Sequence, residues 1–213
     1  MFVPQINKTT VMVASRGGGK TVACQRMIKE SSPFANAVDS YQVHSNGISV
    51  HQYDMLLYKG SPHRIYPELN IDAIRSVFEI NQRRRDKSKV LINFCLIFDD
   101  CIDKQTGYDK DIQRIFTQGR HFSISIIYLS QSISMGLHPT IKRNTDTWFI
   151  WQPRIKNDVT WLYENILCIK YEKEEALKLI RSLEPFECII ATFQSSQLEL
   201  FKYKAYYKHV RKE

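Results

Sequence analysis

A glycine-rich loop after an apolar run is the feature that most constrains how this chain can fold. The run Thr9–Val13 has β-strand character, and residues 14–21 then read Ala-Ser-Arg-Gly-Gly-Gly-Lys-Thr. A helical pattern follows over residues 22–30. This order is typical of a phosphate-binding loop, because glycines let successive backbone N–H groups turn toward a polyphosphate.

The residue types of the loop suit a nucleotide such as ATP. We expect the Lys20 ammonium to contact the β- and γ-phosphates and the Thr21 hydroxyl to ligate Mg²⁺. The N-terminus of the following helix adds partial positive charge. Ala14 stands where the usual pattern begins with glycine. The residues expected to hold the nucleotide are Ser15, Arg16, Gly17, Gly18, Gly19, Lys20 and Thr21.

A second signal is an apolar run, residues 90–98, that ends in Asp99 and Asp100. It predicts a buried strand that delivers a carboxylate to the Mg²⁺ side of the phosphates. We expect Asp99 to hold the ion, mostly through water, since Mg²⁺ keeps much of its hydration shell. Asp100 would orient and deprotonate the attacking water, a task usually given to the longer Glu.

Three further polar residues are candidates for catalysis. Residues 123–129 predict a core strand, and Gln131 follows it, where an open α/β sheet binds its ligand. Its amide could sense the γ-phosphate or position water. Arg120 precedes this strand, and Arg143 precedes the strand predicted at Thr147–Trp151. Either arginine could be a finger that reaches a neighbour's nucleotide and stabilises the transferring phosphoryl group, and a structural salt bridge is the alternative.

The order of apolar runs and helical patterns favours a mainly parallel sheet covered by helices. The length of 213 residues, 43% of them hydrophobic, suits a single α/β domain. Beyond the motifs we expect one strand within residues 34–45 with a turn at 46–47, and a helix over 71–81. The basic run at 82–89 that continues this helix is either a solvated helix end or a loop that contacts DNA or phosphate. We also expect helices over 157–170 and 172–183 with Ile169 facing inward, and a hairpin of 186–193 with 198–203.

Charge and composition suggest the setting in which the chain works. The 30 Lys and Arg residues against 22 Asp and Glu give a net charge of +8, which favours a polyanionic partner. Basic and aromatic residues alternate in the tail at 202–212, a pattern that suits a nucleic-acid backbone, a capsid protein or a frayed edge strand. No signal-peptide pattern or apolar run of roughly 18 residues is visible, so we expect an intracellular protein without a membrane span.

These motifs resemble those of the viral genome-packaging ATPases of the FtsK–HerA superfamily, the poxvirus-type DNA-packaging group. The matching segments are residues 14–21, 96–100, 119–121 with 124–131, and 141–144. The resemblance implies one P-loop NTPase domain, RecA-like and ASCE-type, over residues 1–213. Its core motifs would lie in 8–152, and C-terminal helices, hairpin and basic tail in 153–213.

The resemblance also implies an ATPase that pumps double-stranded DNA of any sequence into a preformed capsid. ATP and Mg²⁺ would be its cofactors. Its partners would be further copies in a ring of five or six, the DNA, and a capsid or vertex protein, with no membrane span. It would be located in the virion or at the site of virus assembly in the host cytoplasm.

Other functions remain open from the residues. Cellular DNA translocases and mobilisation ATPases share the core motifs. A nucleoside or nucleotide kinase can have this length, but no arginine-rich lid is visible, and the second carboxylate of Asp100 suits water as the acceptor. A non-catalytic nucleotide- or DNA-binding capsid component is a third class, against which the intact Lys20, Thr21 and Asp99 argue.

Overall fold

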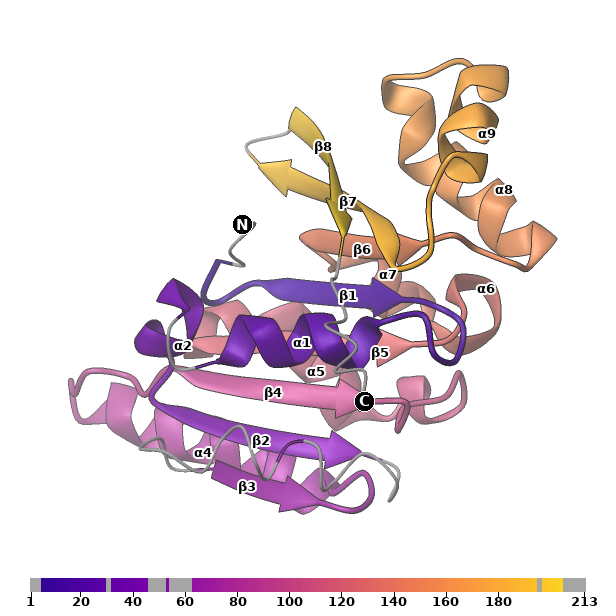
Figure 1. Ribbon diagram of the computed structural model, residues 1–213. Helices are drawn as coiled ribbons and strands as arrows, with labels where there is room; N and C mark the ends of the chain where they lie inside the picture. The colour runs from indigo at the N-terminus through magenta and orange to yellow at the C-terminus, as the bar shows by residue number, and fades with distance from the viewer. Residues whose placement is uncertain (1–4, 30–31, 46–52, 54–62, 195–196, 205–213) are drawn as a thin grey trace, which may run out of the picture.

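In the computed structural model, which describes residues 5–29, 32–45, 53, 63–194 and 197–204, the strands join in one sheet with helices on both faces (Figure 1). The strand order in this described part is β3-β2-β4-β5-β1-β6-β7-β8. The strands are β1 (Thr9–Val13), β2 (Ser40–Ser45), β3 (His63–Tyr66), β4 (Phe94–Asp99), β5 (Ile124–Ser130), β6 (Thr147–Trp151), β7 (Glu187–Gln194) and β8 (Gln197–Lys204).

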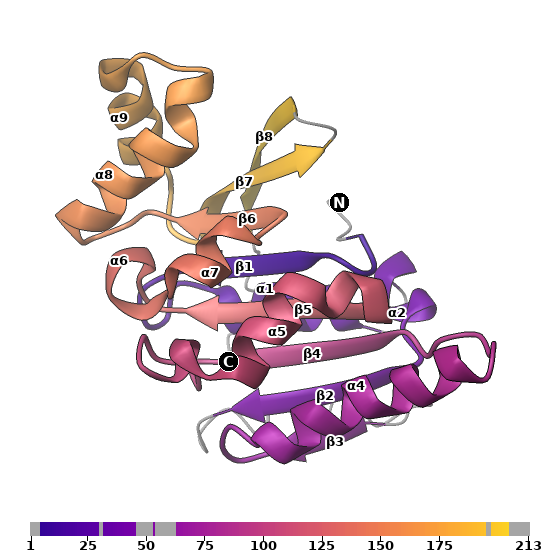
Figure 2. The same cartoon turned by 180° about the vertical axis from the view of Figure 1, so that it is seen from behind.

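Helices connect the strands, and α8 and α9 lie beyond β6, away from the rest of the sheet (Figure 1). Figure 1 shows α1 and α2 in front of the strands, and the reverse view of Figure 2 shows α4, α5, α6 and α7 on the other face. The helices are α1 (Lys20–Ile28), α2 (Pro33–Ala37), α4 (Ile71–Asp86), α5 (Lys110–Gln118), α6 (Ile133–Gly136), α7 (Pro139–Arg143), α8 (Lys156–Asn165) and α9 (Lys173–Arg181), with short 3₁₀ turns η1 (Thr106–Tyr108), η2 (Gly119–Phe122) and η3 (Leu167–Ile169).

The central strands are apolar on both sides because both faces of the sheet are covered. On β4, Leu96 and Phe98 pack in the cluster that includes α4 and α5, whereas Cys95 and Ile97 pack in the cluster that includes α1. Successive side chains of a strand point to opposite faces, so a doubly covered parallel strand reads as a continuous apolar run.

The pairing confirms the mainly parallel sheet with a C-terminal hairpin that the sequence predicts. Strands β3, β2, β4, β5, β1 and β6 pair in parallel, whereas β7 pairs antiparallel with both β6 and β8. Strand β5 lies between β1 and β4, and Ser130 of β5 pairs with Val13 while Leu129 pairs with Asp99. The carboxyl ends of the three strands are therefore aligned at one edge.

Several boundaries differ from the prediction. Strand β4 begins at Phe94 rather than at Val90, whose side chain is 84% exposed. The segment 34–45 contains α2 before its strand, since Pro33 starts a helix capped by the Ser32 hydroxyl. The predicted helix 157–170 ends at Asn165, and Ile169 is 57% exposed rather than inward.

Residues 82–86 of the basic run form the end of α4, and residues 87–89 follow the helix. Arg83 pairs with Glu79, Arg84 donates to the Val90 carbonyl, and Arg85 donates to the His121 carbonyl. These contacts attach the end of the helix to neighbouring segments. The turn predicted at residues 46–47 and the tail at 205–212 lie outside the described residues.

Candidate active site

The phosphate loop connects β1 to α1 at the carboxyl edge of the sheet. Gly17 and Gly19 have φ angles of 76° and 106°, in the region that side chains disfavour. The Gly18 N–H donates to the Ser15 carbonyl at 2.9 Å and closes the turn. Gly19 gives α1 no side-chain cap, so the first N–H groups of the helix can point toward an anion.

Ala14 occupies the position at which such a loop usually begins with glycine, and Gly18 accommodates it. A Cβ atom on residue 18 would lie 2.7 Å from the Ala14 Cβ and 3.0 Å from the Ser15 carbonyl oxygen. The Ala14 methyl group therefore fills space that only a glycine at position 18 leaves open.

Lys20 is buried, with an exposed fraction of 6%, and its charge is paired. Its Nζ donates to the Ala14 carbonyl at 3.2 Å and lies 3.3 Å from Asp100 Oδ2. Gln131 Nε2 donates to the same carboxylate oxygen at 3.2 Å. Asp100 has a φ of 52°, an uncommon left-handed conformation that follows the end of β4. The structure thus brings three predicted site residues together at one oxygen atom.

Asp99 is 3% exposed, and two hydroxyl groups reach one of its oxygens. Thr21 Oγ1 lies 3.5 Å and Tyr53 OH 2.9 Å from Oδ2. Burial raises the pKa of Asp99, and the charge of Asp100 adds to this, while the Tyr53 hydrogen bond, the Lys20 charge and the Thr21 hydroxyl lower it. A carboxylate beside a hydroxyl is an all-oxygen donor set, which fits the ligand preference of Mg²⁺.

Tyr53 is a site residue that sequence reasoning missed. Its side chain is fully buried, and burial holds the pKa of the phenol well above its ordinary value, so the phenol is a neutral donor toward Asp99. The two residues are 46 positions apart. No local sequence pattern indicates this contact, because it depends on how the chain packs against α1 and β4.

A cavity of about 520 Å³ opens beside the phosphate loop. Loops that follow β1, β4, β5 and β6 form its walls, so it lies at the edge where the three motifs meet. Its lining includes Ser15, Arg16, Asp100, Ile102, Tyr128, Gln131, Ser132, Met135, Pro153, Arg154, Ile155 and Asp158.

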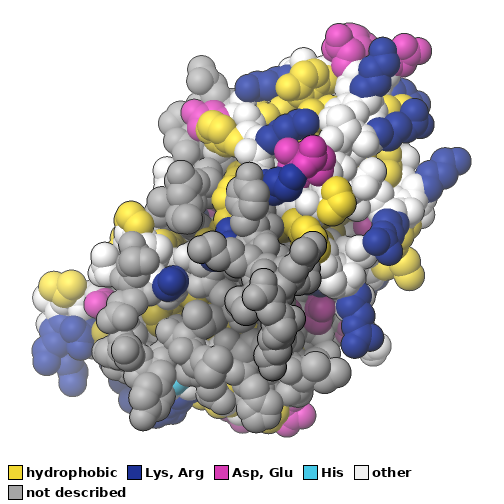
Figure 3. Space-filling view, viewed as in Figure 1, with side chains coloured by type: hydrophobic (Ala, Val, Ile, Leu, Met, Phe, Trp, Pro, Cys, Tyr) yellow, Lys and Arg dark blue, Asp and Glu magenta, His cyan; other side chains and the backbone are white. Residues whose placement is uncertain are grey.

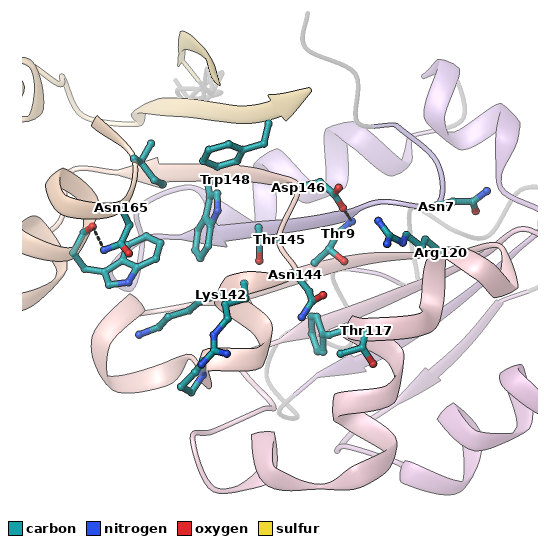
Figure 4. Close-up of a pocket in the computed structure, with 16 residues that line it drawn as sticks. Asn7, Thr9, Thr117, Arg120, Lys142, Asn144, Thr145, Asp146, Trp148 and Asn165 are labelled. Carbon is teal, nitrogen blue, oxygen red and sulfur yellow. Dashed lines mark hydrogen bonds between the residues drawn. The ribbon is translucent and has the colours of Figure 1, made fainter. Parts of the chain in front are cut away.

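Arg120 and Arg143 line a different cavity of about 680 Å³, shown in Figure 4 with Arg120 beside Thr9 and Asp146. Arg120 precedes β5 and Arg143 precedes β6, and both strands run parallel to β1. The arginines therefore lie at the amino ends of the strands. Neither arginine is among the residues that line the cavity beside the phosphate loop.

The described residues contain neither a metal-binding cluster of side chains nor a helix that could span a membrane. Three or more His, Cys, Asp or Glu side chains do not gather at any point in this part of the chain. None of its helices has both the length and the apolar character needed to cross a membrane. All five cysteines are unpaired thiols, and of these Cys168 is exposed.

Comparison with protein families gives one match that covers most of the chain. The family model described as Poxvirus A32 protein matches residues 10–190. Protein 015R of Frog virus 3 (isolate Goorha) is 27% identical over 112 residues. This match covers 49% of the present chain and 32% of the viral protein, so the chain spans about a third of that relative's length.

Solved structures with a similar fold include viral NTPases. The DNA-packaging ATPase B204 from Sulfolobus turreted icosahedral virus has a TM-score of 0.65 at 14% identity, covering 91% of this chain and 96% of B204. The genome packaging NTPase B204 from Sulfolobus turreted icosahedral virus 2, in complex with AMPPCP, has a TM-score of 0.61 at 14% identity, with the same coverage of both chains.

A bacterial protein has the same fold. EssC (ATPases 2 and 3) from Geobacillus thermodenitrificans has a TM-score of 0.62 at 15% identity, covering 93% of this chain and 40% of EssC. At such identities the likeness concerns the fold, and it confirms the α/β P-loop NTPase class predicted from the sequence.

The Gly18→Ala variant tests the packing inside the phosphate loop. We expect it to weaken ATP binding by about tenfold or more, because the added Cβ would overlap the Ala14 methyl group. Titration with a fluorescent ATP analogue measures this loss. The double variant Ala14→Gly/Gly18→Ala should bind more tightly than Gly18→Ala alone, whereas no recovery would show that the two positions do not compete for space.

Proposed function

The chain belongs to the poxvirus A32 protein family, and from this premise we propose that it is an ATPase that packages double-stranded viral DNA into a preformed capsid. The observation that carries the proposal is the meeting of Lys20, Asp100 and Gln131 at one carboxylate oxygen beside the phosphate loop. The B204 proteins of similar fold are described as a genome packaging NTPase and a DNA-packaging ATPase. Neither the family match nor these neighbours favour a kinase.

The phosphate loop of residues 14–21 binds the triphosphate of ATP in this proposal. The backbone N–H groups of Gly17, Gly18 and Gly19 surround the phosphates, with Ser15 and Arg16 completing the loop. Lys20 exchanges the Asp100 oxygen for a phosphate oxygen when nucleotide is bound. This exchange releases the Asp100 carboxylate at the moment when the γ-phosphate and its attacking water are in place.

Thr21 and Asp99 are the residues that would hold Mg²⁺. The ion, when bound, neutralises negative charge that develops on the phosphates. Mg²⁺ in such sites takes one or two carboxylates and keeps several waters, so this sparse donor set is sufficient. Tyr53 keeps the Asp99 carboxylate fixed by donating to Oδ2 from the buried side.

Asp100 and Gln131 act on water. Asp100 accepts the proton from the attacking water, and Gln131, hydrogen-bonded to the same carboxylate, orients both groups. Since Asp is shorter than Glu, the left-handed backbone of Asp100 helps to turn its carboxylate toward Lys20 and the phosphate loop.

Duplex DNA is the polyanion that the net charge of +8 favours. Figure 3 shows Lys and Arg side chains at both ends of the face in view, over the α8–α9 region and beside the end of α4. Contacts between such residues and phosphates do not depend on base sequence. A capsid or vertex protein is the further partner, and the protein acts at the site of virus assembly in the host cytoplasm or in the virion.

A ring of copies places the arginines where they can act. Arg120 and Arg143 lie at the edge of the sheet opposite the phosphate loop, so they serve a neighbouring copy. Head-to-tail contacts that close by rotation produce rings, here of five or six subunits. In such a ring the arginine cavity of one copy faces the phosphate loop of the next.

Hydrolysis of ATP should depend on Lys20 and Asp100 in different ways. We expect Mg²⁺-dependent phosphate release that increases with duplex DNA, loss of ATP binding in Lys20→Ala, and retained binding in Asp100→Asn. Turnover of Asp100→Asn should fall by about 10²-fold or more, because the amide fills the same space but cannot accept the proton. Wild-type turnover in Lys20→Ala would rule out the phosphate loop as the site, and phosphate transfer to a nucleoside monophosphate would favour a kinase.

The Tyr53→Phe variant tests the hydrogen bond to Asp99. It should raise, several-fold, the Mg²⁺ concentration needed for tight ATP binding and leave binding without Mg²⁺ unchanged, because the loss of one hydrogen bond loosens only the metal-side carboxylate. Fluorescence titration at graded Mg²⁺ measures both. Tyr41→Phe is the matched control, since the Tyr41 hydroxyl is also buried but has no hydrogen-bond partner among the described residues. An equal Mg²⁺ dependence of wild type and Tyr53→Phe would refute this role.

Action of an arginine across a subunit interface can be tested by mixing inactive variants. We expect Lys20→Ala and Arg120→Ala to be inactive alone and to recover part of the ATPase rate when mixed, because some interfaces then pair an intact loop with an intact arginine. The same mixture with Arg143→Ala identifies which arginine serves. Specific activity should also rise with protein concentration.

Two results would contradict the shared site. One is a specific activity that does not change with concentration. The other is the absence of recovery in both mixtures even though the mixed oligomers form, as measured by co-purification of one untagged variant with the other, affinity-tagged variant.

A further inference from the structure

Asp158 of α8 is a buried carboxylate that binds the loop after β5. Its exposed fraction is 2%. Oδ1 accepts hydrogen bonds from Ser132 Oγ at 3.0 Å, Ser134 N at 2.7 Å and Ser134 Oγ at 2.6 Å, and Oδ2 accepts from Ile133 N at 3.2 Å. Burial of a carboxylate is costly unless such donors satisfy it, so this contact firmly joins α8 to the loop.

The hydrogen bonds of this loop fix the backbone on both sides of Gln131. Ser130 Oγ donates to the Ser132 carbonyl at 2.9 Å, and the Ser132 hydroxyl is in turn bound to Asp158. Gly136 packs so closely on Ser130 that a Cβ there would lie 2.6 Å from the hydroxyl oxygen. The exposed side chain of Gln131 is thus carried by a rigid backbone, and its Nε2 reaches Asp100.

Helix capping alone does not account for Asp158. Helix α6 is four residues long, and Ser132 already caps it by accepting a hydrogen bond from Met135 N at 3.1 Å. A second, fully buried acceptor from a distant helix adds little to so short an element. Asp158 instead fixes the direction in which the loop after β5 presents Gln131 to the cavity beside the phosphate loop. Asp158 also lines this cavity.

We propose that Asp158 is a positioning residue for ATP hydrolysis, which holds the loop of residues 130–134 so that Gln131 meets Asp100 and the attacking water. The inference rests on the proposed function, in which Asp100 is the base. Asp158 itself touches none of the reacting atoms and acts through Gln131. Its effect should therefore be on the chemical step and should disappear when the Gln131 amide is absent.

The Asp158→Asn variant tests this role, because an amide of the same shape accepts at one atom only and turns an NH₂ group toward the loop donors. We expect kcat to fall by about tenfold, equivalent to about 1.4 kcal/mol, while KM for ATP stays within about twofold of wild type. Glu164→Gln is the matched control, since Glu164 is an exposed carboxylate of the same helix, and its kinetics should equal those of wild type.

The double variant Gln131→Ala/Asp158→Asn separates positioning from general stability. If Asp158 acts through Gln131, the double variant should have the kcat of Gln131→Ala alone. Losses that multiply, or a wild-type kcat for Asp158→Asn, would overturn the inference. Should Asp158→Asn fail to fold, Ser134→Ala removes a single donor, and its smaller fall in kcat must likewise vanish in the Gln131→Ala background. Absence of ATP hydrolysis by the wild type would instead overturn the proposed function, and this inference with it.

Discussion

The parallel pairing of β1, β5 and β4 is the constraint on which the candidate site depends. Neighbouring strands are about 4.8 Å apart, so the insertion of β5 separates β1 from β4 by about 10 Å. The long side chain of Lys20 spans this gap to Asp100, and Gln131 projects from the strand between them. The aligned carboxyl ends of the three strands thus supply all of these side chains from one edge of the sheet.

Much of the fold could be predicted because local patterns agree with the tertiary structure. Strands β1 and β6 have the predicted bounds, since each is a fully buried, largely apolar run that begins at a threonine. The start of β4 could not be predicted, because hydrophobicity does not distinguish the exposed Val90 from the buried Phe94. The prediction that Ile169 faces inward was wrong for a related reason. Helix α8 ends at Asn165, before the helical periodicity could bring Ile169 to the buried face.

The candidate site likewise contains some residues that could be predicted from the sequence and others that could not. Lys20, Thr21 and Asp99 belong to motifs whose strand context is local, so they could be predicted as nucleotide and metal ligands. In the fold Thr21 lies 3.5 Å from Asp99 and Lys20 lies 3.3 Å from Asp100, and the roles of these residues stay predictions. Tyr53 and Asp158 could not be found from the sequence. Each forms its contact 24 or more residues away, and a single buried tyrosine or aspartate has no periodic or spacing signal. Such supporting residues become visible only when the packing that joins distant segments is known.

The two edges of the sheet also constrain any assembly that uses the arginines. Arg120 and Arg143 precede strands that run parallel to β1, whereas the phosphate loop follows β1, so the arginines and the loop are associated with opposite ends of the strands. A twofold dimer whose strands run antiparallel brings the loop of each copy to the arginines of the other, and its two sites close in a pair. A head-to-tail contact leaves one loop and one arginine surface open at its ends and repeats until rotation closes a ring. If the arginines act on a neighbour's nucleotide, a ring is therefore the assembly expected of a head-to-tail contact, and the oligomeric state of the active form distinguishes it from a twofold dimer.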